Sequence, residues 1–102
     1  MQVKQLQEKI VQWVTLWDEK RNVAPTQEHT IMHLVEEVGE LSAQYVNLEQ
    51  RQDKYEPAEI ENAIGDILIQ LFKLAHLRNL DVETIITNIF EKEKFRLTYE
   101  NK

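Results

Sequence analysis

Three carboxylates stand close together in the stretch HLVEEVGELSAQ, at Glu36, Glu37 and Glu40, around a lone glycine. A second glycine-acid doublet, ending in Asp66, follows later in the chain. Carboxylate oxygens are ligands that Mg²⁺ and Mn²⁺ prefer, and a carboxylate can also take a proton from an attacking water. These acids are therefore the residues with the clearest chemical potential, provided that the fold brings them together.

The elements that must position these acids are helices, because apolar residues recur along the chain at intervals of three and four. Two Gly and two Pro leave few turns and disfavour an all-β fold. We therefore expect an all-α fold with four helices. The first begins at Val3, the second runs from the N-cap Thr26 to about Gln50, the third from Pro57 to near Asn79, and the fourth follows the N-cap Asp81.

The fourth predicted helix carries an apolar stripe before a charged tail. Helices normally bury such a stripe against a neighbour. We therefore expect its apolar residues to face inward: Val82, Ile85, Ile86, Ile89 and Phe90.

Helical spacing also predicts where the acids meet. At about 100° per residue, positions 33, 37, 40 and 44 form a column along one edge of the second apolar stripe, and positions 59, 63, 66 and 70 form the matching column on the third helix. Packing the two stripes together would bring Glu37, Glu40 and Asp66 close. Convergent carboxylates repel one another unless they are protonated or share a cation, so the pattern predicts a common divalent ion.

The acids and the glycines can each have a purely structural role as well. Acids on a helix most often form a solvated face, and this fits Glu36 best, because it projects nearly opposite the apolar stripe. Each glycine inside a helix costs about 1 kcal/mol relative to Ala, and both stand directly before an acid, which favours the ion site. Glycine can also let two helices pack closely, and close packing is compatible with an ion site.

Composition narrows the possible functions. The length of 102 residues predicts one domain, and no segment resembles a membrane span or a signal peptide, so we expect a cytoplasmic protein without membrane contact. The absence of cysteine excludes a disulfide framework and a thiolate site. A net charge of −6 argues against a nucleic-acid surface, and an anionic small ligand would need help from a cation.

The pattern EEVGEL on one helix, followed after a short polar connection by GDILIQL on the next, resembles the MazG-like all-α nucleoside triphosphate pyrophosphohydrolases. The likeness covers most of the second and third helices and extends loosely to the final LDVETIITNIFEKEKFRLTY. It implies a four-helix MazG-like bundle over residues 1–102 that cleaves an NTP or dNTP to the monophosphate and pyrophosphate. In that family, E-E-x-x-E followed by E-x-x-D holds Mg²⁺, with Mn²⁺ as an alternative, and the ion grips the phosphates.

Carried over to this sequence, the motif implies that Glu37, Glu40 and Asp66 are metal ligands. Glu36 would be a flanking acid that, with Glu37, holds or activates the attacking water. The sequence departs from the motif at Ala63, where the glutamate of E-x-x-D is expected. Glu59, one turn earlier in the same column, is a further candidate ligand.

Substrate contacts are expected from two places. The family often has a Lys-Asn pair and a later Arg on its last helix; here Lys94 matches the Lys, while other residues occupy the two remaining positions and Arg96 is a nearby cation. Base recognition would fall to aromatic and amide side chains near the column, although Trp13 and Trp17 also fit a buried stripe. The remaining candidates are His33, Tyr45, Asn47 and Asn62.

The missing glutamate at position 63 also supports a second hypothesis. The chain would then be a catalytically degenerate helical module that binds a nucleotide or a partner protein without turnover. Wide apolar stripes in about 100 residues leave surface for another chain, and the resemblance implies dimers or dimers of dimers. We therefore expect self-association as a dimer or tetramer under both hypotheses.

Overall fold

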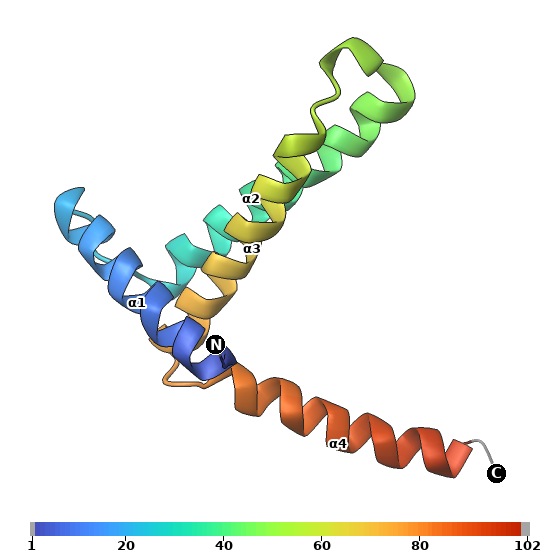
Figure 1. Ribbon diagram of the computed structural model, residues 1–102. Coiled ribbons are helices and arrows are strands. Elements are labelled where there is room, and N and C mark those ends of the chain that lie inside the picture. Colours follow the sequence, from blue (N-terminus) through green and yellow to red (C-terminus); the bar gives the residue numbers. More distant parts are fainter. Residues whose placement is uncertain (1, 101–102) are drawn as a thin grey trace.

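The computed structural model describes the backbone of residues 2–100 and the side chains of residues 2–98. Within that part the chain is entirely helical, without a strand, so the predicted all-α class with four main helices is confirmed (Figure 1). The elements are α1 (Val3–Lys20), α2 (Gln27–Gln50), the short 3-10 helix η1 (Gln52–Lys54), α3 (Pro57–Leu77) and α4 (Val82–Glu100).

The helices α2 and α3 form a long antiparallel pair, joined at its tip by η1 (Figure 1). Two side chains of α2 close this connection: Oε1 of Gln44 accepts from the backbone N–H of Glu56 at 2.8 Å, and Nδ2 of Asn47 donates to the carbonyl of Lys54 at 3.3 Å. These bonds fix the register of the pair. Position 44 therefore lies beside the start of α3, and position 33 lies near the residues that follow Asp66.

The helix ends follow the signals in the sequence. Oγ1 of Thr26 accepts from the N–H of His29 at 3.1 Å, and Oδ1 of Asp81 accepts from the N–H of Glu83 at 3.3 Å, so both predicted N-caps are confirmed. Asn22 and Asn79 follow the ends of α1 and α3 with φ of 56°. Asparagine tolerates this left-handed conformation better than most residues, and it stops both helices.

Helix α1 crosses the pair near the end of α3 (Figure 1). The small core gathers there: Val14 of α1 and Phe72 and Ala75 of α3 are all buried. Ala63, the fourth buried apolar residue among those described, lies nearer the start of α3. The core thus fixes how α1 lies over one part of the α2–α3 pair.

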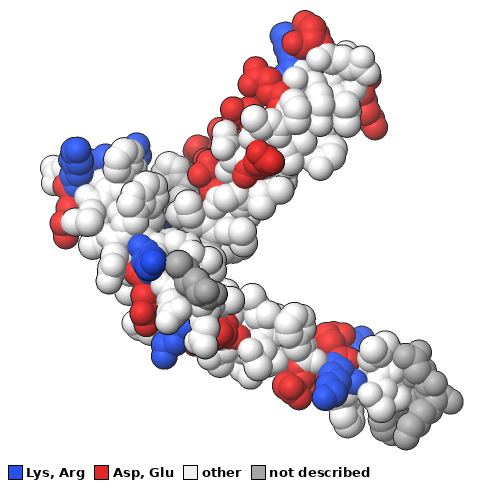
Figure 2. Space-filling model, in the orientation of Figure 1, with Lys and Arg blue, Asp and Glu red and all other residues white. Residues whose placement is uncertain are grey.

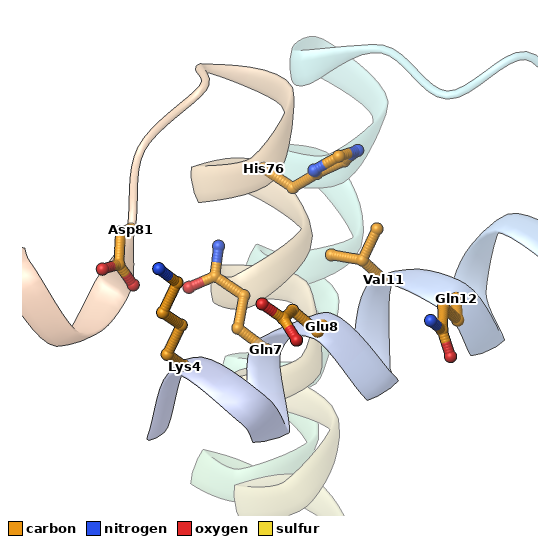
Figure 3. A pocket seen from close by; sticks show the side chains of 7 residues that line it. All are labelled: Lys4, Gln7, Glu8, Val11, Gln12, His76 and Asp81. Carbon is orange, nitrogen blue, oxygen red and sulfur yellow. The ribbon is translucent and has the colours of Figure 1, made fainter. Parts of the chain in front are cut away.

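Helix α4 leaves this core and extends away from the α2–α3 pair (Figure 1). Gln7 holds its first turn, because Nε2 donates to the carbonyl of Leu80 at 3.0 Å and Oε1 accepts from the N–H of Val82 at 2.9 Å. Gln7 also lines a hollow of about 340 Å³ between α1 and the turn before α4 (Figure 3). The expectation that the apolar stripe of α4 faces inward is wrong for one chain beyond the half-buried Val82. Ile85 and Ile86 are exposed, and Ile89 and Phe90 are 51% and 68% exposed.

The chain is therefore elongated. Its radius of gyration is 17.1 Å, whereas a compact domain of this length would have about 13 Å. No helix in residues 2–100 is long and apolar enough to cross a membrane.

Helix packing within one chain does not require either glycine. A Cβ atom added at Gly39 or Gly65 would meet no other group within 4 Å. The helix-packing role is thus wrong for the isolated chain, and both glycines lie on exposed parts of α2 and α3.

Candidate functional site

The predicted convergence of carboxylates is present. Glu37 of α2 interacts electrostatically with Glu40 of the same helix and with Asp66 of α3. Figure 2 shows acidic side chains along the arm that α2 and α3 form. Burial raises the pKa of Glu37 from an ordinary 4.5 to about 7, helped by the negative charges of Glu40 and Asp66. Such a shift requires the three groups to lie within interaction range, which the antiparallel register provides.

One oxygen of this cluster has no donor. Among the described residues, none donates a hydrogen bond to Oε2 of Glu37, although that atom is buried. Ionised carboxylates only accept, so Glu40 and Asp66 bond to Glu37 only when a proton is shared, which also favours the protonated form of Glu37. The buried oxygen therefore needs either a proton or a cation.

The side chains do not stand as a closed set of ligands. Within the described residues, no group of three or more His, Asp or Glu side chains has metal-binding geometry. The backbone fixes how near the acids are, whereas rotation about the bonds of the exposed Glu40 and Asp66 side chains decides where their oxygens point. Mutual repulsion keeps uncompensated carboxylates apart, and a cation between them would remove the cause of that separation.

Two of these carboxylates, Glu37 and Asp66, line a cavity of about 300 Å³ between α1 and the α2–α3 pair. This volume lies at the lower end of the range of small-molecule sites, which is about 300–1,000 Å³. We call it the inter-helix cavity. Its walls are Trp13, Val14, Trp17, Asp18 and Arg21 from α1 and its C-cap, His33 and Glu37 from α2, and Asp66, Ile69, Gln70 and Lys73 from α3.

The α1 wall is aromatic and cationic. The rings of Trp13 and Trp17 stack with centroids 5.8 Å apart and an interplanar angle of 11°, and the guanidinium carbon of Arg21 lies 4.2 Å from the centre of the Trp17 ring. The tryptophans are 53% and 41% exposed, so a buried stripe does not explain them. Exposed flat rings beside a cation offer a stacking surface for a planar ligand.

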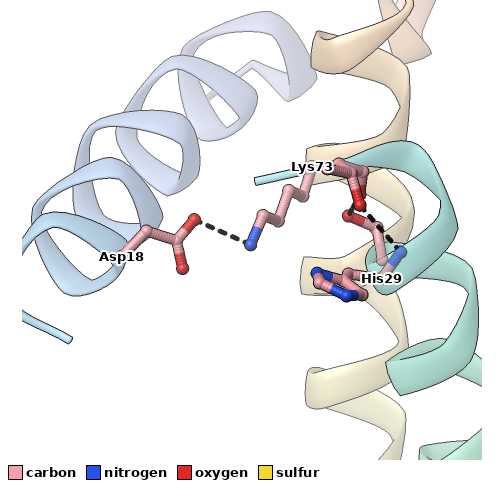
Figure 4. Close-up of polar contacts among 5 residues, drawn as sticks. Asp18, His29 and Lys73 are labelled. Carbon is pink, nitrogen blue, oxygen red and sulfur yellow. Dashed lines mark hydrogen bonds and ion pairs between the residues drawn. The ribbon is translucent and has the colours of Figure 1, made fainter. Parts of the chain in front are cut away.

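The α3 wall carries an ion pair that crosses to α1. Nζ of Lys73 lies 2.8 Å from Oδ2 of Asp18, and the two side chains are only 14% and 13% exposed (Figure 4). Beside them, Oε1 of Gln70 is buried, and no donor among the described residues reaches it. The cavity therefore combines carboxylates, a cation, an unpartnered amide oxygen and aromatic rings.

Glu36 and His33 lie at the rim of this arrangement. Nδ1 of His33 is 3.8 Å from Oε2 of Glu36, and both side chains are well exposed. His33 lines the cavity, but Glu36 does not. The predicted roles of Glu36 in activating water and of His33 in binding the substrate stay predictions.

Other predicted residues of the α2–α3 pair lie outside the cavity lining. Glu59 and Asn62 are exposed on α3, Tyr45 is 55% exposed, and Asn47 is committed to the connection with η1. Ala63 is 3% exposed between the helices. The structure thus brings neither Glu59 nor Asn62 into the cavity of one chain.

Lys94 and Arg96 lie on α4, which extends away from the carboxylates (Figure 1). An exposed ion pair links Arg96 to Glu93 at 3.3 Å. One chain does not bring either cation to the cluster, so their predicted phosphate contacts need a second chain.

Sequence reasoning missed several residues of the cavity. On α3, the column of positions 59, 63, 66 and 70 continues by three residues to Lys73, so extending it by one turn would have found this cation. No comparable signal identifies Asp18 or Arg21, because their place depends on how α1 crosses the pair.

The shifted pKa of Glu37 predicts a pH-dependent stability for the metal-free protein. The folded pKa of about 7 exceeds the unfolded 4.5, so the folded state binds more protons between these values and the free energy of unfolding falls as pH rises through them. The loss is complete above pH 7. Glu37 is only partly buried, so solvent screens much of the effect, and we expect Glu37→Gln to add about 0.5 kcal/mol at pH 8 and to raise Tm by roughly 2–4 °C.

The measurement is thermal unfolding followed by circular dichroism in a chelator-containing buffer at pH 4 and pH 8. At pH 4 the substitution should have little effect, since Glu37 is then protonated in the folded state and largely protonated in the unfolded state. Glu61→Gln, at an exposed position of α3, is the matched control. An equal gain at both pH values would contradict the shifted pKa.

Comparison with known proteins places the cluster in a family. The family model of the MazG nucleotide pyrophosphohydrolase domain matches residues 25–99, which include α2, α3 and the carboxylates. Among solved structures, the chain is similar to the Bacillus-conserved MazG protein, a nucleotide pyrophosphohydrolase, with a TM-score of 0.68 and 26% identity over 90% of this chain and 88% of that one. No curated protein matches the chain. The match over residues 25–99 shows that the chain belongs to the MazG nucleotide pyrophosphohydrolase domain family.

Proposed function

We propose that the protein is a divalent-metal-dependent pyrophosphohydrolase that converts an NTP or dNTP to the monophosphate and pyrophosphate. The observation that carries this proposal is the convergence of Glu37, Glu40 and Asp66, two of which, Glu37 and Asp66, line the inter-helix cavity. Membership of a family of nucleotide pyrophosphohydrolases supports the reaction class. The acidic chain would then bind its anionic substrate through a cation.

The donor set fits Mg²⁺ or Mn²⁺, because it consists of carboxylate oxygens and includes the buried, unpartnered Oε2 of Glu37. Glu37, Glu40 and Asp66 would hold the ion, and Glu59 remains a candidate only if it acts through water. When bound, Mg²⁺ supplies positive charge to the phosphate oxygens and to the leaving pyrophosphate. Magnesium normally keeps several waters, so a three-carboxylate site remains compatible with the absence of a glutamate at position 63.

The carboxylates also supply a base. Water attacks the α-phosphorus, the bond between that phosphorus and the bridging oxygen breaks, and a carboxylate accepts the proton that the water loses. Glu37 is one candidate for this base, and a cation shared with Glu40 and Asp66 would lower its pKa from the value of about 7 in the metal-free cluster and so keep it ionised. Glu36, one residue earlier and exposed, is the second candidate.

The tryptophan wall would take the base of the nucleotide. Trp13, Trp17 and His33 line the same cavity, and the exposed Trp13 ring, which stacks on Trp17, is the aromatic surface proposed for the base. Base stacking on aromatic side chains contributes about 1–3 kcal/mol per base and tolerates different bases. This contact would orient the phosphates toward Glu37 and Asp66.

We further propose that the protein self-associates as a dimer or tetramer. One chain exposes 8253 Å², whereas a compact monomer of 12.2 kDa would expose about 6,100 Å². The excess of roughly 2,000 Å² exceeds the ~800 Å² that one partner buries in a standard interface. Exposed apolar residues account for much of it, including a groove of about 510 Å³ between α1, α3 and α4. A second chain would also be the source of Lys94 and Arg96.

The alternative is a degenerate module that binds a nucleotide without turnover. Its specific support is Ala63, which is 3% exposed and adds no carboxylate between the helices. Pyrophosphate release and metal binding separate the hydrolase from the degenerate module.

A pyrophosphate-release screen with ribo- and deoxyribonucleoside triphosphates tests the reaction. We expect turnover with at least one triphosphate at millimolar Mg²⁺ or Mn²⁺, and loss of turnover on addition of a chelator. Glu40→Gln and Asp66→Asn should each lower kcat/KM by about 100-fold or more, since each removes a ligand charge. Glu61→Gln is the exposed control. Turnover that persists in both variants would refute the site.

Ala63→Glu tests whether the missing carboxylate limits the enzyme. A fourth acid beside Glu37 and Glu40 adds repulsion, so we expect a lower Tm without metal. With metal, the variant should bind the ion more tightly in calorimetry and show higher kcat. Saturation at 100 times Kd would add about 2.7 kcal/mol of stability. Tighter metal binding in Ala63→Glu, with no turnover in either protein, would favour the degenerate module.

Light scattering at micromolar concentration tests self-association. We expect a mass of at least twice 12.2 kDa. Phe90→Glu, on the exposed stripe of α4, should lower the mass toward that of one chain without lowering helix content, because this ring is exposed in one chain. Asn88→Glu, on the polar side of α4, should leave the mass unchanged. A wild-type monomer would exclude the assembly.

A further inference from the structure

The ion pair between Lys73 and Asp18 (Figure 4) lies in the wall of the inter-helix cavity. Asp66, Gln70 and Lys73 all line this cavity from α3. Lys73 follows Asp66 by two helical turns, which places their backbones about 10 Å apart along the helix. The four-carbon stem of lysine reaches across part of that distance. Lys73 is thus close enough to serve a ligand that is anchored at the carboxylates.

The cavity needs such a cation. Asp18, Glu37 and Asp66 line it, Glu40 is adjacent, and a triphosphate carries several further negative charges. A single divalent ion does not balance this sum. Among the described residues that line the cavity, Arg21 and Lys73 are the lysine and arginine side chains.

The two cations differ in what they can offer. The guanidinium of Arg21 lies over the Trp17 ring, at the wall assigned to the base. The ammonium of Lys73 has three donors, and the pair with Asp18 uses one of them. Because the pair is largely screened from water, the ammonium is held in place, and its other N–H groups stay available to an anion.

We propose that Lys73 contacts the phosphate chain of the nucleotide within one chain, and that Asp18 is the positioning residue that holds its ammonium in the cavity. This inference rests on the proposed function, since it assigns a phosphate contact to the same site. It differs from the predicted contacts of Lys94 and Arg96, which α4 keeps away from the carboxylates of its own chain.

A purely structural role for the pair makes different predictions. If the ion pair only ties α1 to α3, then Lys73→Met and Asp18→Asn should lower stability together and affect every ligand alike. If Lys73 contacts phosphate, its loss should weaken ligands in proportion to their phosphates. Asp18→Asn should then weaken phosphate ligands selectively but less than Lys73→Met, because the cation remains but is no longer held in place.

The test measures binding of inorganic pyrophosphate, a deoxyribonucleoside triphosphate and the matching nucleoside by calorimetry in Mg²⁺ buffer. The variants are Lys73→Met, Lys73→Arg and Asp18→Asn, with Lys20→Met, an exposed lysine outside the cavity, as the control. We expect Lys73→Met to weaken pyrophosphate and triphosphate binding by about 10- to 100-fold, the range for a charged hydrogen bond. Nucleoside binding should change little, and Lys73→Arg should restore most of the loss.

Kinetics add a second readout that keeps the two proposals separable. Where turnover is present, Lys73→Met should raise KM more than it lowers kcat, and an unchanged KM would overturn the inference while leaving the hydrolase intact. Where no triphosphate is turned over, a selective loss of pyrophosphate binding in Lys73→Met supports the inference although the hydrolase fails. Equal losses for nucleoside and pyrophosphate overturn the inference. If Lys73→Met does not fold, Asp18→Asn decides by the same comparison: a loss for pyrophosphate without a loss for the nucleoside supports the inference, and equal losses overturn it.

Discussion

The packing of α2 against α3 is the constraint on which the site depends. The two helices contact each other closely, with Leu34 and Leu41 of α2 half-buried and Ala63 of α3 buried. The antiparallel register sets Glu37 of one helix against Asp66 of the other. The hydrophobic gain holds the acids together although they repel, because neither acid can withdraw without opening the pair. The raised pKa of Glu37 reflects this opposition between burial of apolar surface and separation of like charges.

Charge explains how an acidic protein can serve an anionic substrate. The chain carries a net charge of −6, yet the inter-helix cavity places Lys73 and Arg21 on the walls facing the carboxylates. A divalent ion at Glu37 and Asp66 would join these cations in holding phosphate oxygens. The buried Oε2 of Glu37 and the near-buried pair of Lys73 with Asp18 then belong to one electrostatic arrangement.

The position of α4 follows from a small core. Val14, Phe72 and Ala75 fix α1 on α3, and Gln7 holds the first turn of α4, but no described residue covers the stripe further along that helix. Phe90 is 68% exposed for this reason. Exposed apolar surface on this scale is typical of chains that assemble. The proposed assembly would bring Lys94 and Arg96 of one chain to the carboxylates of another.

The sequence by itself determined the helices, their caps at Thr26 and Asp81, and the meeting of Glu37, Glu40 and Asp66, because helical periodicity and capping are local and the two columns lie on neighbouring helices. Only the tertiary structure decided the rest. The crossing of α1 placed Asp18 beside Lys73 and left the tryptophan rings exposed, and the departure of α4 left its stripe uncovered. These features depend on the angle between helices, which side-chain packing at a few core positions sets and which no short sequence pattern encodes.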